Sequence, residues 1–206
     1  MTASTGLRGL LVDWGGVMTT NVFDSFRAFC AQEGLDADTV GDRFRSDPAS
    51  RELLIGLETG RLSEPEFEQR FGAVLGVEPV GMIERMFAGG VADDAMQDAV
   101  RRARAAGVRT GLISNSWGTS RYDRGLLAEL FDGVVISGEV GMRKPTPEIY
   151  ALGAEAIAVD AGECVFVDDL RFNLSPAREL GMATVHHVEA AQTISQLEKL
   201  LSLPLR

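Results

Sequence analysis

After residue 90, short apolar runs alternate with segments of helical periodicity, and this alternation restricts the fold more than any other feature. The apolar runs cover residues 108–113, 134–136, 164–167 and 183–186. The helical patterns cover residues 93–107, 126–130, 146–157, 173–180 and 193–201. Strands separated by single helices join one sheet as parallel strands through right-handed crossovers. We therefore predict an α/β fold whose core is a Rossmann-like parallel sheet.

A further apolar run lies near the start of the chain and ends in a carboxylate. Leu10 to Val12 is typical of a buried parallel strand, and Asp13 follows it directly. Gly15 and Gly16 then break the pattern. Open α/β sheets bind ligands at the carboxyl ends of their strands, so Asp13 is well placed to be a nucleophile or a metal ligand. Taken alone, however, the pattern is more typical of an ordinary turn.

Between residues 20 and 90 the sequence shows helical periodicity and no strong strand signal. Apolar residues from Val22 to Cys30 fall on one helical face, and shorter helical patterns cover 36–45, 50–57 and 82–87. Ser63 and Glu66 have the spacing of a capping box and predict a helix that begins there. We predict that residues 20–90 form a helical insertion in a core made of residues 1–19 and 91–206.

Polar side chains follow three more of the predicted strands. They are Ser114, Asn115, Lys144, Asp168, Asp169 and, one helical turn later, Asn173. Parallel strands bring their carboxyl ends to one edge of the sheet, so these groups should converge with Asp13. Carboxylates from distant strands need a cation between them, and Mg²⁺ is the usual hard ion beside phosphate. The hydroxyl and the ammonium would complete a site for phosphoryl transfer, which depends mainly on positioning and charge stabilisation.

In these motifs and their order, the chain resembles the haloacid dehalogenase (HAD) superfamily. Asp13 to Val17 resembles the first motif, Ser114 the second, Lys144 the third, and Asp168–Asp169 with Asn173 the fourth. The surrounding sequence is similar to the branch that holds sugar-phosphate phosphatases and the N-terminal phosphatase domain of epoxide hydrolases. The resemblance covers essentially the whole chain and implies the HAD fold, with residues 20–90 as a helical cap that selects the substrate.

The resemblance also implies which residues would bind a metal. Asp13 would be the nucleophile that forms an aspartyl-phosphate, and it would bind Mg²⁺ together with the carbonyl oxygen of Gly15. Asp169 aligns with the metal-binding acid of the fourth motif. Asp168 would then support the metal site from behind or through a water molecule.

The phosphate-binding residues are implied in the same way. Ser114, Asn115 and Lys144 would hold the phosphoryl group, and Lys144 would also offset the charge of Asp13. Ser114 and Lys144 therefore join Asp13 in the predicted catalytic set. Asn173 would orient its neighbours without taking part in the chemistry.

One position departs from the pattern of the superfamily. Its phosphatases usually carry a second Asp two residues after the nucleophile, and Gly15 stands there instead. That Asp acts as a general acid and base, a role typically worth about 10²–10⁴-fold in rate. We predict Mg²⁺-dependent hydrolysis of small phosphomonoesters, slowed by this loss.

Two alternatives stay open at this point. One is a ligand- or partner-binding protein with weak catalysis, because Gly15 supplies no acid. The other is a metal-independent 2-haloacid dehalogenase, an enzyme class that also lacks the second Asp. Against the dehalogenase, Asp168 and Asp169 would leave unneutralised charge beside the Asp13 nucleophile and a carboxylate substrate.

The composition of the chain limits the classes of partner that it can bind. The 206-residue chain is 45% hydrophobic and carries a net charge of −10, which argues against nucleic acid or an anionic membrane as the main partner. Cys30 and Cys164 lie in apolar stretches and are expected to be buried free thiols. Residues 1–6 do not have the pattern of a signal peptide, and no apolar run reaches membrane-spanning length. We therefore expect a cytoplasmic protein that binds a small phosphorylated metabolite, with its oligomeric state left open.

Three other features have a weaker connection to function. His186 and His187 point to opposite faces of a predicted strand, so they cannot easily share an ion. Trp117 follows the second motif and is a candidate for the wall of a pocket. Arg43, Arg45 and Arg51 could contact an anionic substrate, but we favour ordinary surface positions for them.

Overall fold

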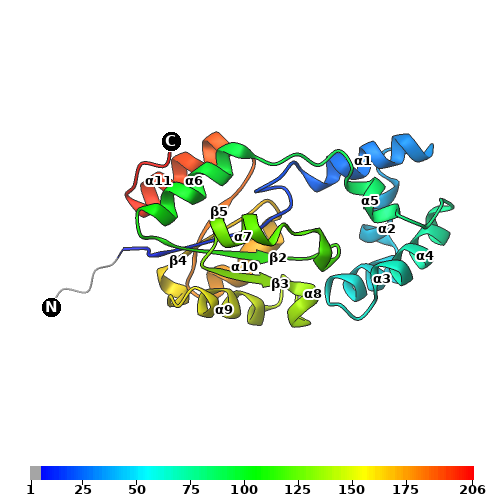
Figure 1. Cartoon of the computed structure of the whole chain (residues 1–206). Helices are drawn as coiled ribbons and strands as arrows, with labels where there is room; N and C mark the ends of the chain where they lie inside the picture. The colour runs from blue at the N-terminus through cyan, green and yellow to red at the C-terminus, as the bar shows by residue number, and fades with distance from the viewer. Residues whose placement is uncertain (1–5) are drawn as a thin grey trace.

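The computed structural model describes residues 6–206 in two parts, a sheet covered by helices and a separate group of helices beside it (Figure 1). The prediction for the N-terminal residues 1–6 therefore lies, except for Gly6, outside the described residues. Within the described range, no helix is both long and apolar enough to cross a membrane. Cys30 and Cys164 are buried free thiols, as predicted.

The sheet has five strands, all paired in parallel. They are β1 (Gly9–Val12), β2 (Arg109–Ser114), β3 (Gly133–Ile136), β4 (Cys164–Asp168) and β5 (Ala183–His186). Their order is β3-β2-β1-β4-β5, so β1 lies at the centre and the chain turns to opposite sides of it. Open sheets of this kind form their ligand crevice at such a switch point. The predicted α/β class is confirmed.

Helices cover both faces of this sheet. They are α6 (Asp94–Ala105), α7 (Arg124–Leu130), α9 (Pro147–Ala156), α10 (Arg171–Glu179) and α11 (Ala190–Leu201). Along β1, Leu10 and Val12 pack in the core under α6, α7 and α11, whereas Leu11 packs in the core under α9 and α10. This alternation follows from the two-residue period of a strand. A strand buried on both faces must be apolar throughout, which explains the continuous apolar runs.

The stretch from residue 22 to residue 87 forms five helices, which we call the helical bundle. They are α1 (Val22–Glu33), α2 (Thr39–Ser46), α3 (Pro48–Glu58), α4 (Glu64–Leu75) and α5 (Met82–Phe87). The bundle has its own core, which is rich in phenylalanine and methionine and includes Phe29, Phe67 and Phe71. Ser63 caps α4, and its predicted capping box with Glu66 is formed.

Two short connections join the bundle to the sheet, and they run side by side. Thr19 and Ala92 form an isolated antiparallel bridge, and the Thr20 N–H donates to the carbonyl of Val91 at 2.8 Å. The Asp93 N–H donates to the carbonyl of Met18 at 2.9 Å. The bundle therefore leaves and re-enters the sheet part at one place.

A few element boundaries differ from the sequence prediction. The helix expected from residue 36 begins at Thr39, and the helix expected from residue 173 begins at Arg171. A short helix, α8 (Ser137–Val140), was not predicted, because four residues are too few to show a periodic pattern. It lies directly after β3 and leads the chain towards Lys144.

Candidate active site

The strand register explains why the predicted residues meet. Val12 is level with Val167 on β4 and with Leu112 on β2, so Asp13, Asp168 and Ser114 all lie at the carboxyl edge of the sheet. The Asp13 N–H continues the ladder by donating to the carbonyl of Val167 at 2.9 Å. β1 thus ends between its two neighbours, at the switch point of the sheet.

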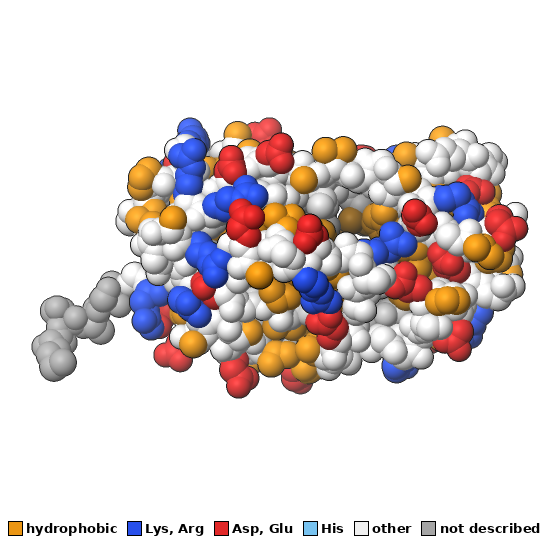
Figure 2. Space-filling model, in the orientation of Figure 1, with side chains coloured by type: hydrophobic (Ala, Val, Ile, Leu, Met, Phe, Trp, Pro, Cys, Tyr) orange, Lys and Arg blue, Asp and Glu red, His pale blue; other side chains and the backbone are white. Residues whose placement is uncertain are grey.

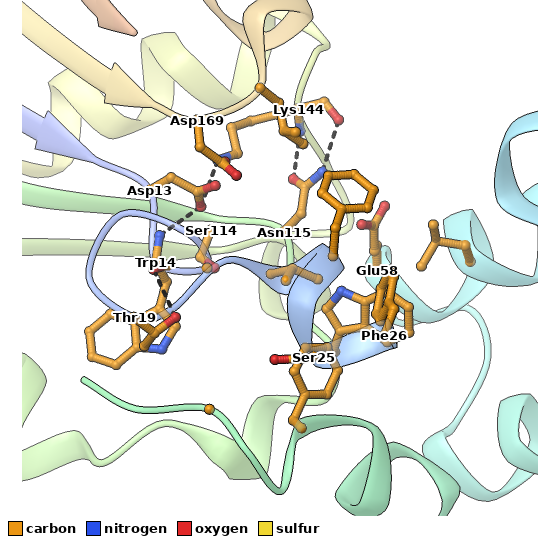
Figure 3. Close-up of a pocket in the computed structure, with 18 of the residues that line it drawn as sticks. Asp13, Trp14, Thr19, Ser25, Phe26, Glu58, Ser114, Asn115, Lys144 and Asp169 are labelled. Carbon is orange, nitrogen blue, oxygen red and sulfur yellow. Dashed lines mark hydrogen bonds and ion pairs between the residues drawn. The ribbon is translucent and has the colours of Figure 1, made fainter. Parts of the chain in front are cut away.

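Lys144 reaches this edge from the loop between α8 and α9. Its side chain is fully buried, and its ammonium lies 2.7 Å from a carboxylate oxygen of Asp13 (Figure 3). The same ammonium lies 2.7 Å from a carboxylate oxygen of Asp168. Burial disfavours the charged ammonium, but the two carboxylates outweigh burial and raise the pKa of Lys144. Lys144 is therefore a fixed positive charge between two strand ends.

Asp168 and Asp169 are adjacent in sequence but have different surroundings. Both oxygens of Asp168 accept hydrogen bonds, from Lys144, from the Asn173 amide and from the Leu170 N–H. Asp169 is half-buried, and its carboxylate lies on the side of Asp13 and Lys144 in the view of Figure 3. Asp168 therefore holds the lysine, whereas Asp169 is the acid that is freer to bind a ligand.

Three carboxylates gather at this point. Asp13, Asp168 and Asp169 each offer an oxygen, and these oxygens lie within 4.8 Å of one another. Burial and the neighbouring carboxylates raise the pKa of Asp13, while Lys144 opposes the rise. Burial and Asp168 raise the pKa of Asp169 to about 6. A hard cation with oxygen ligands, such as Mg²⁺, fits this donor set, because it would relieve the repulsion between the acids.

The two glycines after Asp13 have different structural constraints. Gly16 has a φ of +77°, and a Cβ there would lie 2.4 Å from an oxygen of Asp169. Only glycine fits this position, for both reasons. At Gly15 a Cβ would meet a methyl group of Val22 at 2.8 Å. A side chain at position 15 would therefore require Val22, at the start of α1, to move.

Ser114 and Asn115 follow β2 and have partners within the protein. The Ser114 hydroxyl forms a hydrogen bond of 2.8 Å with the hydroxyl of Tyr122. The Asn115 side chain is bonded to the main chain of Lys144, donating to its carbonyl at 3.0 Å and accepting from its N–H at 2.8 Å. In this arrangement the Asn115 side chain positions Lys144. Its predicted contact with a phosphoryl group stays a prediction.

A cavity of about 730 Å³ opens in front of these residues, between the sheet and the helical bundle. Figure 2 shows a hollow between the two parts of the molecule. In Figure 3, Asp13, Lys144 and Asp169 lie on one side of the cavity, and Ser25, Phe26 and Glu58 lie on the other side. Trp117, the candidate for a pocket wall, lines the cavity. Arg45 and Arg51, for which we favoured ordinary surface positions, are exposed but also line it.

An ion pair between the two parts of the molecule was not predicted. Glu58, at the end of α3, is buried and paired with Arg143, the residue before Lys144. Burial raises the pKa of Glu58, although Arg143 opposes the rise. The sequence contains a signal for Glu58, because it is an acid that continues the apolar face of a helix. Tyr122 lies in a stretch without periodicity, where the sequence offers no such signal.

The two histidines do not face each other. The His186 Nε2 atom lies 2.9 Å from the carbonyl oxygen of Asp169, and the His187 Nδ1 atom lies 3.0 Å from the Thr193 hydroxyl. Each ring therefore has its own hydrogen-bond partner within the protein. Trp14 packs in a T-shaped contact on Tyr122, with ring centroids 6.0 Å apart, at the sheet side of the cavity.

Comparisons with known proteins bear on this site. Residues 7–181 match the family model described as haloacid dehalogenase-like hydrolase. The chain is 33% identical over 111 residues to bifunctional epoxide hydrolase 2 of Rattus norvegicus; the match covers 50% of this chain but only 20% of the rat protein. It is 27% identical over 210 residues to D-ribitol-5-phosphate phosphatase of Bacteroides thetaiotaomicron, covering 95% of this chain and 99% of that protein.

A solved structure has the same fold. It is a HAD family enzyme from Bacteroides thetaiotaomicron in complex with magnesium and inorganic phosphate. The TM-score is 0.66 at 23% identity, and the match covers 89% of this chain and 95% of that one.

Proposed function

Because the chain belongs to the haloacid dehalogenase-like hydrolase family, we propose that it is a Mg²⁺-dependent phosphatase that acts through an aspartyl-phosphate. One observation carries the proposal: the buried ammonium of Lys144 is paired with Asp13, and Asp169 lies beside them. The Lys144 ammonium alone would balance the charge of one nucleophilic carboxylate. Three carboxylates leave negative charge that a second cation, the metal ion, would balance. A relative named D-ribitol-5-phosphate phosphatase also supports the proposal.

In this mechanism a carboxylate oxygen of Asp13 attacks phosphorus, and the bond between phosphorus and the ester oxygen breaks. The ester oxygen keeps the bonding electrons, takes a proton from solvent and leaves as the alcohol. Lys144 and the Ser114 hydroxyl hold the phosphoryl oxygens during the transfer. Water then attacks phosphorus, which releases phosphate and restores the Asp13 carboxylate. Asp13, the carbonyl oxygen of Gly15 and Asp169 would hold a bound Mg²⁺. The ion would neutralise the negative charge of the phosphoryl group and of these carboxylates.

The remaining residues would hold this arrangement in place. Asn115 positions Lys144 through its main chain, and Asp168 fixes the lysine ammonium with the help of Asn173. We assign the helical bundle, within residues 20–90, to a cap that closes over the carboxyl edge of the sheet. Its paired connections at Thr19 and Ala92 support this role, since both would bend at one place.

A second candidate function rests on the absence of an acid at Gly15. A protein with this site could bind phosphate esters and release them unchanged, because no carboxyl group two residues after Asp13 protonates the leaving group. The dehalogenase alternative is less well supported. Asp169 would repel a 2-haloacid unless a cation neutralised it, and a metal-independent enzyme holds no such cation.

The test is hydrolysis of p-nitrophenyl phosphate by the full chain. Nitrophenolate is a good leaving group that needs no proton, so the lack of an acid at Gly15 should matter little. We expect turnover that requires Mg²⁺ and is lost in Asp13→Asn, while the matched control Asp160→Asn, an exposed acid away from the site, stays active. Activity that persists in excess chelator would rule out the metal-dependent mechanism. Release of halide from 2-chloropropionate without metal would favour the dehalogenase.

A further inference from the structure

The wall of the cavity opposite Asp13 is aromatic. Trp117 comes from the loop after β2 and stands among rings of the helical bundle, with centroids 5.4 Å from Phe26, 5.8 Å from Phe44 and 5.3 Å from Phe87. All four side chains line the cavity. Trp117 comes two residues after Asn115 and thus places an aromatic surface close to the point where phosphate would bind.

Aliphatic side chains extend this surface. Leu54 and Ile55 on α3 and Val22 on α1 also line the cavity and are only half-buried. Leu54 and Ile55 do not belong to the core of the helical bundle, so the packing of the bundle does not account for them. Apolar side chains that face an open cavity instead of a core indicate a surface kept for an apolar ligand.

Several polar side chains around this surface are already engaged by the protein. Glu58 is paired with Arg143, and Asn115 is bonded to the main chain of Lys144. The Tyr122 hydroxyl is bonded to Ser114. A ligand rich in hydroxyl groups would have to compete for these partners or lose its hydrogen bonds to water without replacement.

Two arginines that line the cavity have partners within the protein. Arg45 pairs with Asp42. Arg51 donates to the main-chain carbonyls of Phe44 and Arg45 and thus provides hydrogen bonds for carbonyl groups at the C-terminal end of α2. Because both arginine side chains have these partners, we assign them no role in binding a second anionic group of the substrate.

We propose that the substrates are phosphate monoesters of apolar alcohols with six or more carbons, and not phosphates of small polyols; this inference rests on the proposed phosphatase function. A cavity of about 730 Å³ is within the range of roughly 300–1,000 Å³ that buries drug-sized ligands. The phosphate lies against Lys144 and Asp13, and the carbon chain lies against Trp117 and the aromatic wall. Burial of that chain against the aromatic and aliphatic side chains drives specificity, since these side chains carry no charge.

The experiment compares kcat/KM for n-propyl, n-hexyl and n-octyl phosphate and for a hexitol 6-phosphate, with Mg²⁺ and the full chain. The n-alkanols have similar acidity, so differences among their esters report binding and not chemistry. We expect kcat/KM to rise about fourfold for each added methylene until the wall is covered. We expect hexyl phosphate to exceed the hexitol phosphate by at least about tenfold.

A pair of variants localises the effect. Ile55→Asn places an amide on the wall outside the core of the bundle and should lower kcat/KM for octyl phosphate about tenfold, with little effect on propyl phosphate. Val74→Asn makes the same kind of change at an exposed position on α4 and should alter neither. A loss in Ile55→Asn that is equal for both esters would contradict contact with the chain.

The outcomes separate the two proposals. Turnover of p-nitrophenyl phosphate together with a flat alkyl series, or with preference for the hexitol phosphate, overturns the substrate inference alone. Preference for an alkyl phosphate with a terminal carboxylate also overturns it and assigns Arg45 and Arg51 to binding. If no phosphate is hydrolysed, the proposed function fails. Calorimetry with octyl and propyl phosphonate then tests the apolar wall directly, and equal affinities overturn the inference.

Discussion

Replacing Lys144 by methionine should destabilise the protein strongly and in a pH-dependent way. The substitution keeps most of the volume of a fully buried side chain but removes the charge that two carboxylates share. Loss of one partner from a buried ion pair typically costs about 3–5 kcal/mol, because the other charge stays uncompensated. In a domain of this size, that loss lowers the melting temperature by about 6–20 °C.

Proton uptake by the folded Lys144→Met variant sets an upper limit to its loss of stability. The variant can neutralise Asp13 by binding one more proton than the unfolded chain, whose Asp pKa is near 3.8. At pH 7 this uptake costs about 4 kcal/mol, and the cost falls by about 1.4 kcal/mol for each unit of pH below that. A folded-state pKa raised in this way makes the variant less stable as pH rises. The deficit should therefore be large at pH 7 and small at pH 5.

Thermal unfolding without divalent metal, at pH 5, 6 and 7, measures this effect. Lys199→Met is the matched control, since Lys199 is exposed on α11 and is the one other lysine in the sequence. The double variant Lys144→Met/Asp13→Asn should recover part of the loss, by about 0.5–3 kcal/mol, because one stranded charge is gone. A melting temperature within about 2 °C of wild type at pH 7, or a deficit that does not change with pH, would refute the reasoning.

Three further predictions concern the same site. In a Val22→Ala background, which makes room for a Cβ, Gly15→Asp should raise kcat for alkyl phosphates by about 10²–10⁴-fold; no gain over Val22→Ala alone, in a folded protein, would mean that another group supplies the proton. Mg²⁺ affinity measured by calorimetry should weaken as pH falls through about 6, where Asp169 takes up a proton and competes with the metal; a constant affinity from pH 8 to pH 5 would exclude Asp169 as a ligand. Burial raises the pKa of Glu58, so wild type should lose stability relative to Glu58→Gln as pH rises from about 4.5, and parallel stability curves would contradict this.

The sequence predicted the residues at the strand ends because their signal is local. Asp13, Ser114 and Asp168 each follow an apolar run that can only be a buried strand, and the parallel topology then brings them together. The helical nature of the inserted stretch was equally clear from its periodicity and from the capping box. No part of that reasoning needed a contact between distant residues.

The features that were missed depend on such contacts. Asn115 and Lys144 are 29 residues apart, and the hydrogen bonds between them follow from the path of the α8 turn, which has no periodic signal. Glu58 meets Arg143 only because the helical bundle docks on the sheet at that place. The aromatic wall around Trp117 likewise combines a loop of the sheet part with helices of the bundle, so the individual segments could not predict it.

The scarcity of lysine gives this protein a spectroscopic use. The sequence has two lysines among its 20 basic residues, and the structure places one at the centre of the site and the other on the surface. Protein grown with nitrogen-15 lysine would therefore give two amide signals in a two-dimensional NMR spectrum, and Lys199→Arg would assign them at once. The Lys144 signal would report the arrival of metal, phosphate or alkyl ester at the site, while the Lys199 signal would serve as an internal reference in the same sample.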